Sequence, residues 1–265
     1  MIIDAHVHIF PEKIAEKAVS KLAGISGITP CTNGTVGSTR EIMQKRGINK
    51  AVLLNIATKP SQQASITASA AELNKRDEFI PLGSVHFQAE DWKQELIRIK
   101  ETGLVGVKLH PDYQGFMIND PKMWDIYATC ADLGLFIVFH AGWDCYSPDL
   151  VHAAPKASAE VAAAFPKLKM VLAHMGGLRM EDEVLAHLAG LKNVYFDTAM
   201  AATYTHKDKA KQIINKHGIQ RIFFGSDCPW EDPALTLDFV DSLGLTSNER
   251  QALLAGNILQ LINRA

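Results

Sequence analysis

The first eight residues, Met1-Ile2-Ile3-Asp4-Ala5-His6-Val7-His8, form an apolar run that ends in two histidines. If the run is a strand, His6 and His8 point to the same face, because side chains alternate along a strand. Two imidazoles that project together can bind one metal ion. The stretch therefore predicts a first strand that carries part of a metal site, and it directs the search for further ligands to the ends of other strands.

Seven more short apolar runs follow this strand, and helix-period stretches separate most of them. Their lack of alternation is typical of parallel strands covered on both faces, and their spacing is typical of repeated βα units. We therefore expect an α/β fold, a (β/α)8 TIM barrel. A doubly wound open sheet is the alternative, but no Gly-x-Gly-x-x-Gly motif follows the first strand to favour it. The expected strands are residues 2–9, 51–56, 80–86, 104–110, 135–140, 170–174, 194–197 and 222–227, and the clearest helices are 92–102, 123–133, 158–165 and 207–217.

The first connection is unusually long, from Pro11 to Asn49, and forms a loop insertion after the first strand. It contains two expected helices, residues 11–22 and 38–46, separated by a stretch rich in glycine and threonine. Long βα loops lie over the mouth of a barrel, so this insertion is either a lid or a cover for one barrel edge. Near the other end of the chain, Thr246 and Glu249 match a capping box and predict the start of the last helix.

The composition excludes several classes of protein. The 265 residues carry a net charge of -2, so nothing drives the chain toward nucleic acid or an anionic membrane surface. The longest apolar runs fall short of the roughly 18 residues needed to span a bilayer. The four cysteines show no Cys-x-x-Cys spacing, which fits reduced thiols. We expect a single domain over residues 1–265, in a cytoplasmic protein that acts on a small molecule.

Polar side chains stand at the carboxyl ends of five expected strands. Because these ends converge on one mouth in a barrel, we expect the side chains to face a common point. Imidazole and carboxylate together suit zinc and other borderline divalent ions. The conjunction predicts a metal site there, although each residue alone is a weak signal. The residues are His6 and His8 on the first strand, Lys108 and His110 on the fourth, His140 on the fifth, His174 on the sixth and Asp227 on the eighth.

The set of His6-x-His8, His140, His174 and Asp227, each on a strand end, resembles the amidohydrolase superfamily. Two phrases narrow the resemblance to its amidohydrolase 2 branch: Val-Lys-Leu-His-Pro at 107–111 and Phe-Gly-Ser-Asp-Cys-Pro-Trp at 224–230. The resemblance covers nearly the whole chain, through Leu-Ala-Gly-Asn at 254–257. That branch contains metal-dependent hydrolases as well as aminocarboxymuconate-semialdehyde and resorcylate decarboxylases.

The resemblance implies that His6, His8, His140 and Asp227 hold a divalent metal ion, with zinc as the expected ion. Such a metal lowers the pKa of a bound water toward about 7, and Asp227 would accept the water's proton as a general base. His174 has two readings. It is an acid–base or electrostatic group beside the substrate in a one-metal site, and it is a ligand in a two-metal site.

Lys108 decides between one ion and two. In two-metal relatives a carboxylated lysine from the end of the fourth strand bridges the ions, and Lys108 has the matching place. The alternatives are an unmodified ammonium that binds a substrate carboxylate and a structural ion pair. One ion is the usual state of the branch and is favoured here, with two left open. His110 would contact the substrate or support a ligand, Trp230 would line the mouth, and Asp4 would orient an imidazole.

Three functions follow from these residues. The leading hypothesis is a metal-dependent hydrolase in which a metal-activated water attacks a small amide, ester or lactone, with Asp227 and His174 as proton shuttles. The alternative is a nonoxidative, metal-dependent decarboxylase of a small aromatic or muconate-like acid, in which Asp227 or His174 delivers a proton to carbon. A barrel that only binds a ligand is a weaker third hypothesis, because the ligand set is intact. The resemblance leaves a homodimer open. The histidines expected to be solvated are His152, His187, His206 and His217.

Overall fold

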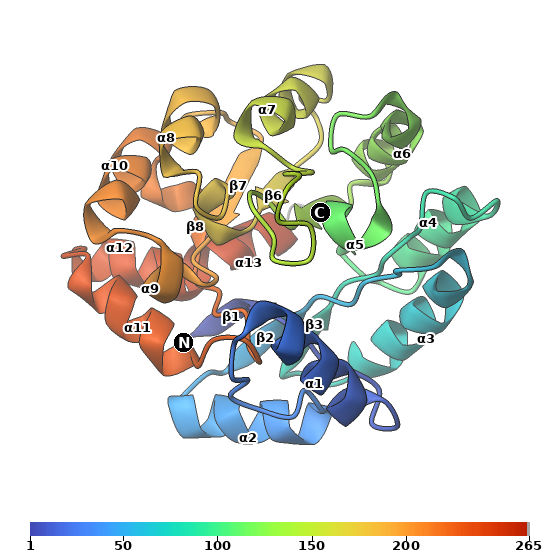
Figure 1. Cartoon of the computed structure of the whole chain (residues 1–265), viewed down its shortest axis with the longest axis horizontal. Coiled ribbons are helices and arrows are strands. Elements are labelled where there is room, and N and C mark those ends of the chain that lie inside the picture. Colours follow the sequence, from blue (N-terminus) through green and yellow to red (C-terminus); the bar gives the residue numbers. More distant parts are fainter. Residues whose placement is uncertain (264–265) are drawn as a thin grey trace.

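Within residues 1–263, the part of the chain that the computed structural model describes, eight parallel β-strands form the centre and helices surround them (Figure 1). Every expected strand is present. Most are shorter than the apolar runs that predict them, because the last residues of each run leave the ladder and turn into the following loop. The strands are β1 (Ile3–Val7), β2 (Lys50–Leu53), β3 (Phe79–Pro81), β4 (Gly106–Leu109), β5 (Phe136–Phe139), β6 (Met170–Leu172), β7 (Val194–Asp197) and β8 (Ile222–Phe223).

The strands close into a barrel. Parallel ladders run β1-β2-β3 and β4-β5-β6-β7-β8. Two seams join these ladders: the amide of Lys108 donates to the carbonyl of Gly83 at 2.8 Å, and the amide of Ala5 donates to the carbonyl of Phe224 at 2.7 Å. The predicted (β/α)8 TIM barrel is confirmed, and the doubly wound open sheet is excluded because both of its edges would be unpaired.

Helices cover the outside of the strands, and Figure 1 shows them as a ring, with the last helix lying across the centre. The four clearest predicted helices appear as α4, α6, α7 and α10. The helices are α1 (Ala15–Ser26), α2 (Val36–Arg46), α3 (Gln63–Leu73), α4 (Trp92–Glu101), α5 (Pro111–Gln114), α6 (Trp124–Leu133), α7 (Pro155–Ala164), α8 (Glu181–Glu183), α9 (Ala201–Tyr204), α10 (Lys207–His217), α11 (Pro233–Ser242), α12 (Ser247–Gln251) and α13 (Asn257–Ile262).

The long first connection holds the two expected helices, with shifted boundaries. Helix α1 ends at Gly27, whose left-handed φ of 71° stops the helix, and α2 begins after Thr35, which forms a capping box with Ser38. The amide of Cys31 donates to the carbonyl of Pro229 at 2.8 Å. The connection therefore reaches across to the segment that follows β8, at the mouth of the barrel. The predicted capping box at Thr246, which begins α12, is also present.

Two layers of apolar side chains stabilise the barrel. The inner layer includes Ile3, Val52, Phe136 and Phe223 from the strands and Ile258 from α13, all fully buried. The larger layer packs the outward strand residues against the surrounding helices. Alternate residues of a strand supply the two layers, as the period of two requires. Among the helices of residues 1–263, none is both long and apolar enough to cross a bilayer.

Candidate metal centre and active site

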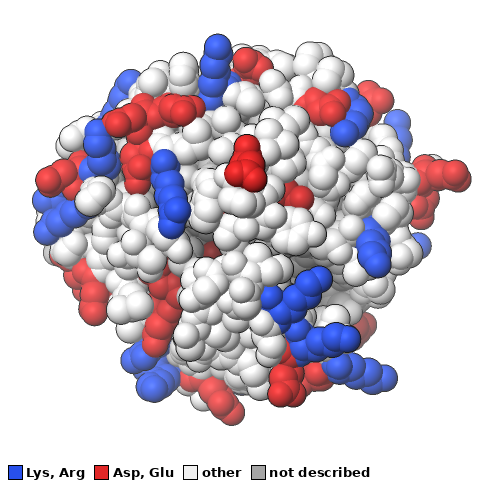
Figure 2. Space-filling model, viewed as in Figure 1, with Lys and Arg blue, Asp and Glu red and all other residues white. Residues whose placement is uncertain are grey.

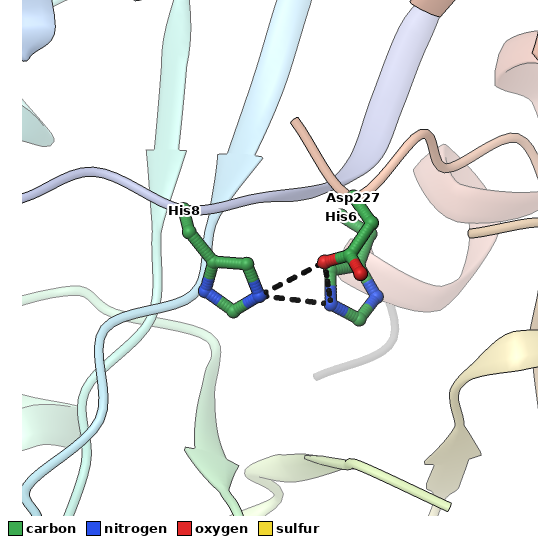
Figure 3. A group of neighbouring side chains, drawn as sticks. All are labelled: His6, His8 and Asp227. Atoms are coloured by element: carbon green, nitrogen blue, oxygen red, sulfur yellow. Dashed lines mark hydrogen bonds and ion pairs between the residues drawn. The ribbon is translucent and has the colours of Figure 1, made fainter. Parts of the chain in front are cut away.

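Three side chains meet where β1 and β8 end: His6 and His8 from the first strand and the residue after it, and Asp227 from the segment after β8 (Figure 3). The Nε2 atoms of His6 and His8 lie 3.2 Å apart, and they lie 3.2 and 3.1 Å, respectively, from Oδ1 of Asp227. In a tetrahedral zinc site with ligands at about 2.0–2.1 Å, neighbouring ligand atoms lie about 3.3–3.4 Å apart. This triangle of ligand atoms therefore has the size of one face of a metal site.

Hydrogen bonds on the far side of each ring decide which nitrogen carries the proton. Nδ1 of His6 lies 2.8 Å from the carboxylate of Asp197, and Nδ1 of His8 lies 2.9 Å from the carbonyl of Leu54. Carboxylate and carbonyl oxygens only accept hydrogen bonds, so we assign the proton of each neutral ring to Nδ1. Both Nε2 atoms then turn a lone pair toward Asp227. This is the tautomer that a metal ligand requires.

With both rings neutral, the triangle is a set of acceptors that lacks a hydrogen-bond donor. Oδ1 of Asp227 is buried and has no hydrogen-bond partner among the described residues. Burial lowers the pKa of His6, but the carboxylates of Asp197 and Asp227 outweigh it and raise that pKa to about 9, so a positive charge is stabilised at this point: a proton on Nε2 of His6, or a metal ion in its place. Burial raises the pKa of Asp227, but His6 and His8 hold it well below its usual range. Lone pairs at this separation repel one another unless a cation lies between them, so this set of three ligand atoms fits a divalent metal ion.

The backbone around the triangle explains how the three residues come together. The register of β1 shifts between Asp4 and Val7, and Asp227 has a left-handed φ of 75° that bends the chain after β8. A Cβ at Gly225 would lie 2.9 Å from the Cβ of His6, so only glycine permits this approach. Asp4 accepts hydrogen bonds from the hydroxyl and the amide of Ser226, at 2.5 and 2.9 Å. The expectation that Asp4 orients an imidazole is wrong, because it fixes the backbone instead.

His140 and His174 form a hydrogen-bonded pair. Nδ1 of His174 lies 3.1 Å from the carbonyl of Ala199, so Nδ1 carries the proton, and Nε2 of His174 accepts from Nδ1 of His140 at 3.0 Å. In this order Nε2 of His140 carries no proton for the two acceptors that it faces, the carbonyl of Trp143 at 3.3 Å and the carboxylate of Asp144 at 3.4 Å, because two neutral rings supply only two ring protons for these contacts. Burial lowers the pKa of His140 to about 4 and that of His174 to about 3, so both rings are neutral.

These contacts bear on two predicted roles. The bare Nε2 of His140 has the chemistry of a ligand, but it is not part of the triangle formed by His6, His8 and Asp227. Its assignment as the fourth ligand stays a prediction. The ring of His174 lies 5.3 Å from that of His6, which places it beside the triangle. Both of its nitrogens are engaged, so its roles as a proton shuttle or as a ligand also stay predictions.

A second group of metal-type side chains lies beside the first. The rings of His110 and His140 stack 4.4 Å apart, and their Nε2 atoms lie 3.7 and 3.4 Å from the carboxylate of Asp144. On the other edge, Nδ1 of His110 lies 3.7 Å from Asp112, and Asp112 pairs with His152 at 3.0 Å. The expectation that His152 is solvated is therefore wrong, because the loop after β5 folds its side chain onto a buried carboxylate. His110 keeps its predicted place near the site.

Lys108 is buried on β4, with 1% of its surface exposed. Burial lowers its pKa to about 8, while the charges of Asp197 and Asp227 act in the opposite direction. Within the described part of the chain, its ammonium forms no ion pair. The structural ion pair considered from the sequence has no partner there, and the ammonium is available to an anionic substrate group. Carboxylation of Lys108, which the two-ion alternative requires, stays a prediction.

The residues at the rim complete the description. Trp230 is half-buried, lies three residues after Asp227 and donates its amide to the carbonyl of Asp227 at 2.8 Å. Its role in lining the mouth stays a prediction. Asp144 and Asp197 were not among the main predicted site residues. Asp197 ends an apolar strand, which is the one sequence signal that could have raised its priority. Asp144 lies in a loop, and no local pattern marks it.

Comparison with known proteins places this chain in a family. A sequence profile of the amidohydrolases matches residues 3–264. The chain is 26% identical over 221 residues to a 2-amino-3-carboxymuconate-6-semialdehyde decarboxylase from Dictyostelium discoideum. The match covers 69% of this chain and 61% of the length of that relative.

Three solved structures have the same fold over almost their whole length. The first is a 5-carboxyvanillate decarboxylase from Sphingomonas paucimobilis (TM-score 0.74, 14% identity, 100% of this chain and 99% of that one). The second is a dihydroxybenzoic acid decarboxylase from a Polaromonas species, with bound manganese and the inhibitor 2-nitroresorcinol (TM-score 0.72, 17% identity, 100% of this chain and 98% of that one). The third is a probable 2-pyrone-4,6-dicarboxylic acid hydrolase from Acinetobacter baumannii (TM-score 0.71, 17% identity, 99% of this chain and 99% of that one).

The family match covers nearly all of the chain, and it agrees with the resemblance that the strand-end motifs carry. The barrel, the His6–His8 pair and Asp227 are the features that the profile spans. This chain therefore belongs to the amidohydrolase superfamily, in its amidohydrolase 2 branch.

Proposed function

We propose that this protein is a metal-dependent decarboxylase that releases carbon dioxide nonoxidatively from a small aromatic or muconate-like acid. The sequence relative and two of the three structures are named decarboxylases, which supports this reaction over the hydrolysis that the sequence placed first. The observation that carries the proposal is the buried, unpaired ammonium of Lys108 beside the ligand triangle. A buried cation without a partner favours an anionic substrate, and a carboxylate is such a group.

The first part of the mechanism is a metal ion. We propose one zinc ion held by His6, His8 and Asp227, with His140 as the fourth ligand, and its charge would stabilise the electron pair that forms on the substrate. Two neutral imidazoles and one carboxylate in the triangle leave such an ion with net positive charge. Asp197 holds His6 in the tautomer that presents Nε2.

The second part is the handling of the substrate and its proton by the chain. The ammonium of Lys108 pairs with an anionic group of the acid and orients it. The bond between carbon and the carboxylate breaks, carbon dioxide leaves, and the electron pair that remains on carbon takes up one proton. Asp227 is a carboxylate at neutral pH, so it takes a proton from the substrate or from water and returns it to carbon. His174 is the second candidate for this transfer once its contact with His140 opens.

The test is a direct comparison of two reactions. Zinc-reconstituted protein is incubated with a panel of hydroxybenzoic and muconate-like acids, and released carbon dioxide is measured. In parallel, small lactones, esters and amides are assayed for hydrolysis. We expect carbon dioxide from at least one acid and a loss of at least about 100-fold in turnover for Asp227→Asn. Asp125→Asn, at an exposed position on α6, is the matched control and should keep full activity.

Two results would contradict the proposal. Hydrolysis of a lactone or ester without any release of carbon dioxide would favour the hydrolase hypothesis. That hypothesis is the second candidate, because a probable 2-pyrone-4,6-dicarboxylic acid hydrolase has the same fold. Full decarboxylase activity in Asp227→Asn would remove this carboxylate from the mechanism.

A further inference from the structure

Arg179 lies in the segment after β6, five residues beyond His174, and two aromatic rings hold its guanidinium. The central carbon of the guanidinium lies 4.2 Å from the ring centre of Trp143 and 4.7 Å from that of Tyr204. Trp143 belongs to the loop after β5, and Tyr204 ends α9, which follows β7. The rings of two neighbouring loops thus fix one cation between them. Contacts of this kind attract a guanidinium to the face of an aromatic ring.

The backbone around Arg179 is built for this placement. Arg179 has a left-handed φ of 60°, which is unusual for a residue with a Cβ. The amide of Trp143 donates to the carbonyl of Leu178 at 3.1 Å, so the two loops are joined directly. Gly142 permits this approach, because a Cβ there would lie 2.1 Å from the amide nitrogen of Leu178. A left-handed residue beside a joined pair of loops indicates that the backbone at Arg179 is fixed, and the two rings then place the exposed side chain.

The hydrogen-bond donors of Arg179 have no partner among residues 1–263. Within residues 1–263 its guanidinium contacts the two rings and forms no ion pair. An aromatic ring attracts the cation without accepting its in-plane N–H groups in the way that an oxygen does, so these groups remain available. A planar guanidinium with free N–H groups matches a carboxylate, which it binds through two parallel hydrogen bonds.

The clamp of Trp143, Arg179 and Tyr204 lies next to the active site. The carbonyl of Trp143 faces Nε2 of His140 at 3.3 Å, and Asp144, the next residue, pairs with the same nitrogen at 3.4 Å. Figure 2 shows that most charged side chains on this face of the molecule stand around its periphery, with no cluster of basic residues over the centre. The clamp of Trp143, Arg179 and Tyr204 therefore stands by itself and not as part of a basic patch.

We propose that Arg179, held between Trp143 and Tyr204, binds a substrate carboxylate other than the one that leaves as carbon dioxide. The inference rests on the proposed function, and it narrows the substrate to acids with a second carboxylate. The rings fix the guanidinium before the substrate arrives, so little conformational entropy is lost on binding. Lysine cannot replace it fully, because an ammonium is a point charge without the planar fork.

The experiment uses binding, and not turnover, as its readout. Two matched pairs of acids are titrated calorimetrically into the zinc-reconstituted protein: isophthalate against 3-methylbenzoate, and muconate against hexa-2,4-dienoate. In each pair a methyl group replaces one carboxylate. We expect at least one dicarboxylate to bind the wild-type protein about 10-fold or more tightly than its methyl counterpart. Arg179→Gln should remove this preference, and Arg179→Lys should retain part of it. Arg98→Gln on α4, an exposed arginine of the outer ring, is the control.

The outcomes separate this inference from the proposed function. If the wild-type protein does not prefer either dicarboxylate, or if Arg179→Gln keeps the preference, the carboxylate subsite is wrong. If the preference depends on Arg179 but no acid loses carbon dioxide, the subsite stands and the proposed reaction fails. Trp143→Leu should weaken the binding of the dicarboxylate more than that of its methyl counterpart, because the guanidinium loses one of the two rings that hold it. An equal loss of affinity for both acids would contradict the clamp.

Discussion

Replacement of Asp197 by asparagine tests whether the tautomer of His6 controls the metal site. The carboxylate of Asp197 takes three hydrogen bonds: from Nδ1 of His6 at 2.8 Å, and from the amides of His174 and Ala199 at 2.9 and 3.1 Å. Asparagine has nearly the same shape, and its side-chain oxygen can still accept the hydrogen bonds from the amides of His174 and Ala199. Its NH2 group then faces Nδ1 of His6, so that Nδ1 must become an acceptor and the ring proton must move to Nε2.

The size of the effect follows from where that proton goes. Nε2 of His6 lies 3.2 Å from Asp227 and 3.2 Å from Nε2 of His8, so a proton there occupies the space of the metal. Loss of an outer carboxylate that orients a ligand histidine typically lowers metal affinity about 10- to 100-fold. We expect the upper end of this range, equivalent to roughly 2.7 kcal/mol, because the variant also removes a buried negative charge beside the ion.

The assay is a competition titration of zinc against a fluorescent chelator at pH 7. Circular dichroism at the same pH checks that the variant folds, since two of the three hydrogen bonds are retained. Asp125→Asn, at an exposed position on α6, is the control for loss of one charge and should bind zinc as the wild-type protein does. If the zinc affinity of a folded Asp197→Asn variant stays within about threefold of the wild-type value, the tautomer argument is refuted.

Three further predictions concern stability. Burial lowers the pKa of His217 to about 3 in the folded state, so between pH 6.5 and 3 the unfolded chain binds one more proton than the folded chain, and stability falls as the pH falls. In denaturant unfolding, the free energy of unfolding of His217→Gln should therefore fall by about 2 kcal/mol less than that of the wild-type protein between pH 7 and pH 5. Parallel pH dependences of the two proteins would contradict this. Gly142→Ala should destabilise the protein by at least about 2 kcal/mol in the same assay, because φ is 87° and the new Cβ meets Leu178; an unchanged midpoint would show that the two loops can separate. Thr246→Ala should cost about 1 kcal/mol through loss of its hydrogen bonds to Glu249, whereas Thr246→Ser, which keeps the hydroxyl, should cost less than half of that.

The barrel and the triangle could be predicted because both follow from periodicity along single strands. Continuous apolar runs mark parallel strands, and the convergence of their carboxyl ends brings distant residues together without knowledge of any loop. The pairing of His6 and His8 needs only the period of two, and the arrival of Asp227 needs only that the eighth strand closes against the first. Strand ends were less accurate. Asp227 lies four residues beyond β8 (Ile222–Phe223), and its left-handed φ bends the chain there.

The supporting residues could not be predicted because they depend on how loops and helices pack. Asp144 reaches His140 only through the fold of the loop after β5. His217 was expected to be solvated, yet it is buried at the end of α10, where its ring stacks on Phe196 at 4.0 Å. His187 and His206, also expected to be solvated, are exposed as predicted. A single histidine on a helix carries no signal that separates these cases, since the difference lies in the neighbouring element.

The central claim is that His6, His8 and Asp227 form a site for a divalent cation. Elemental analysis of protein dialysed against zinc and then against metal-free buffer tests it most directly. We expect one zinc ion per chain in the wild-type protein, and at most a small fraction of one in the double variant His6→Gln, His8→Gln, whose folding is checked by circular dichroism. A folded wild-type protein that retains no divalent ion, or a double variant that retains as much zinc as the wild-type protein, would contradict the account.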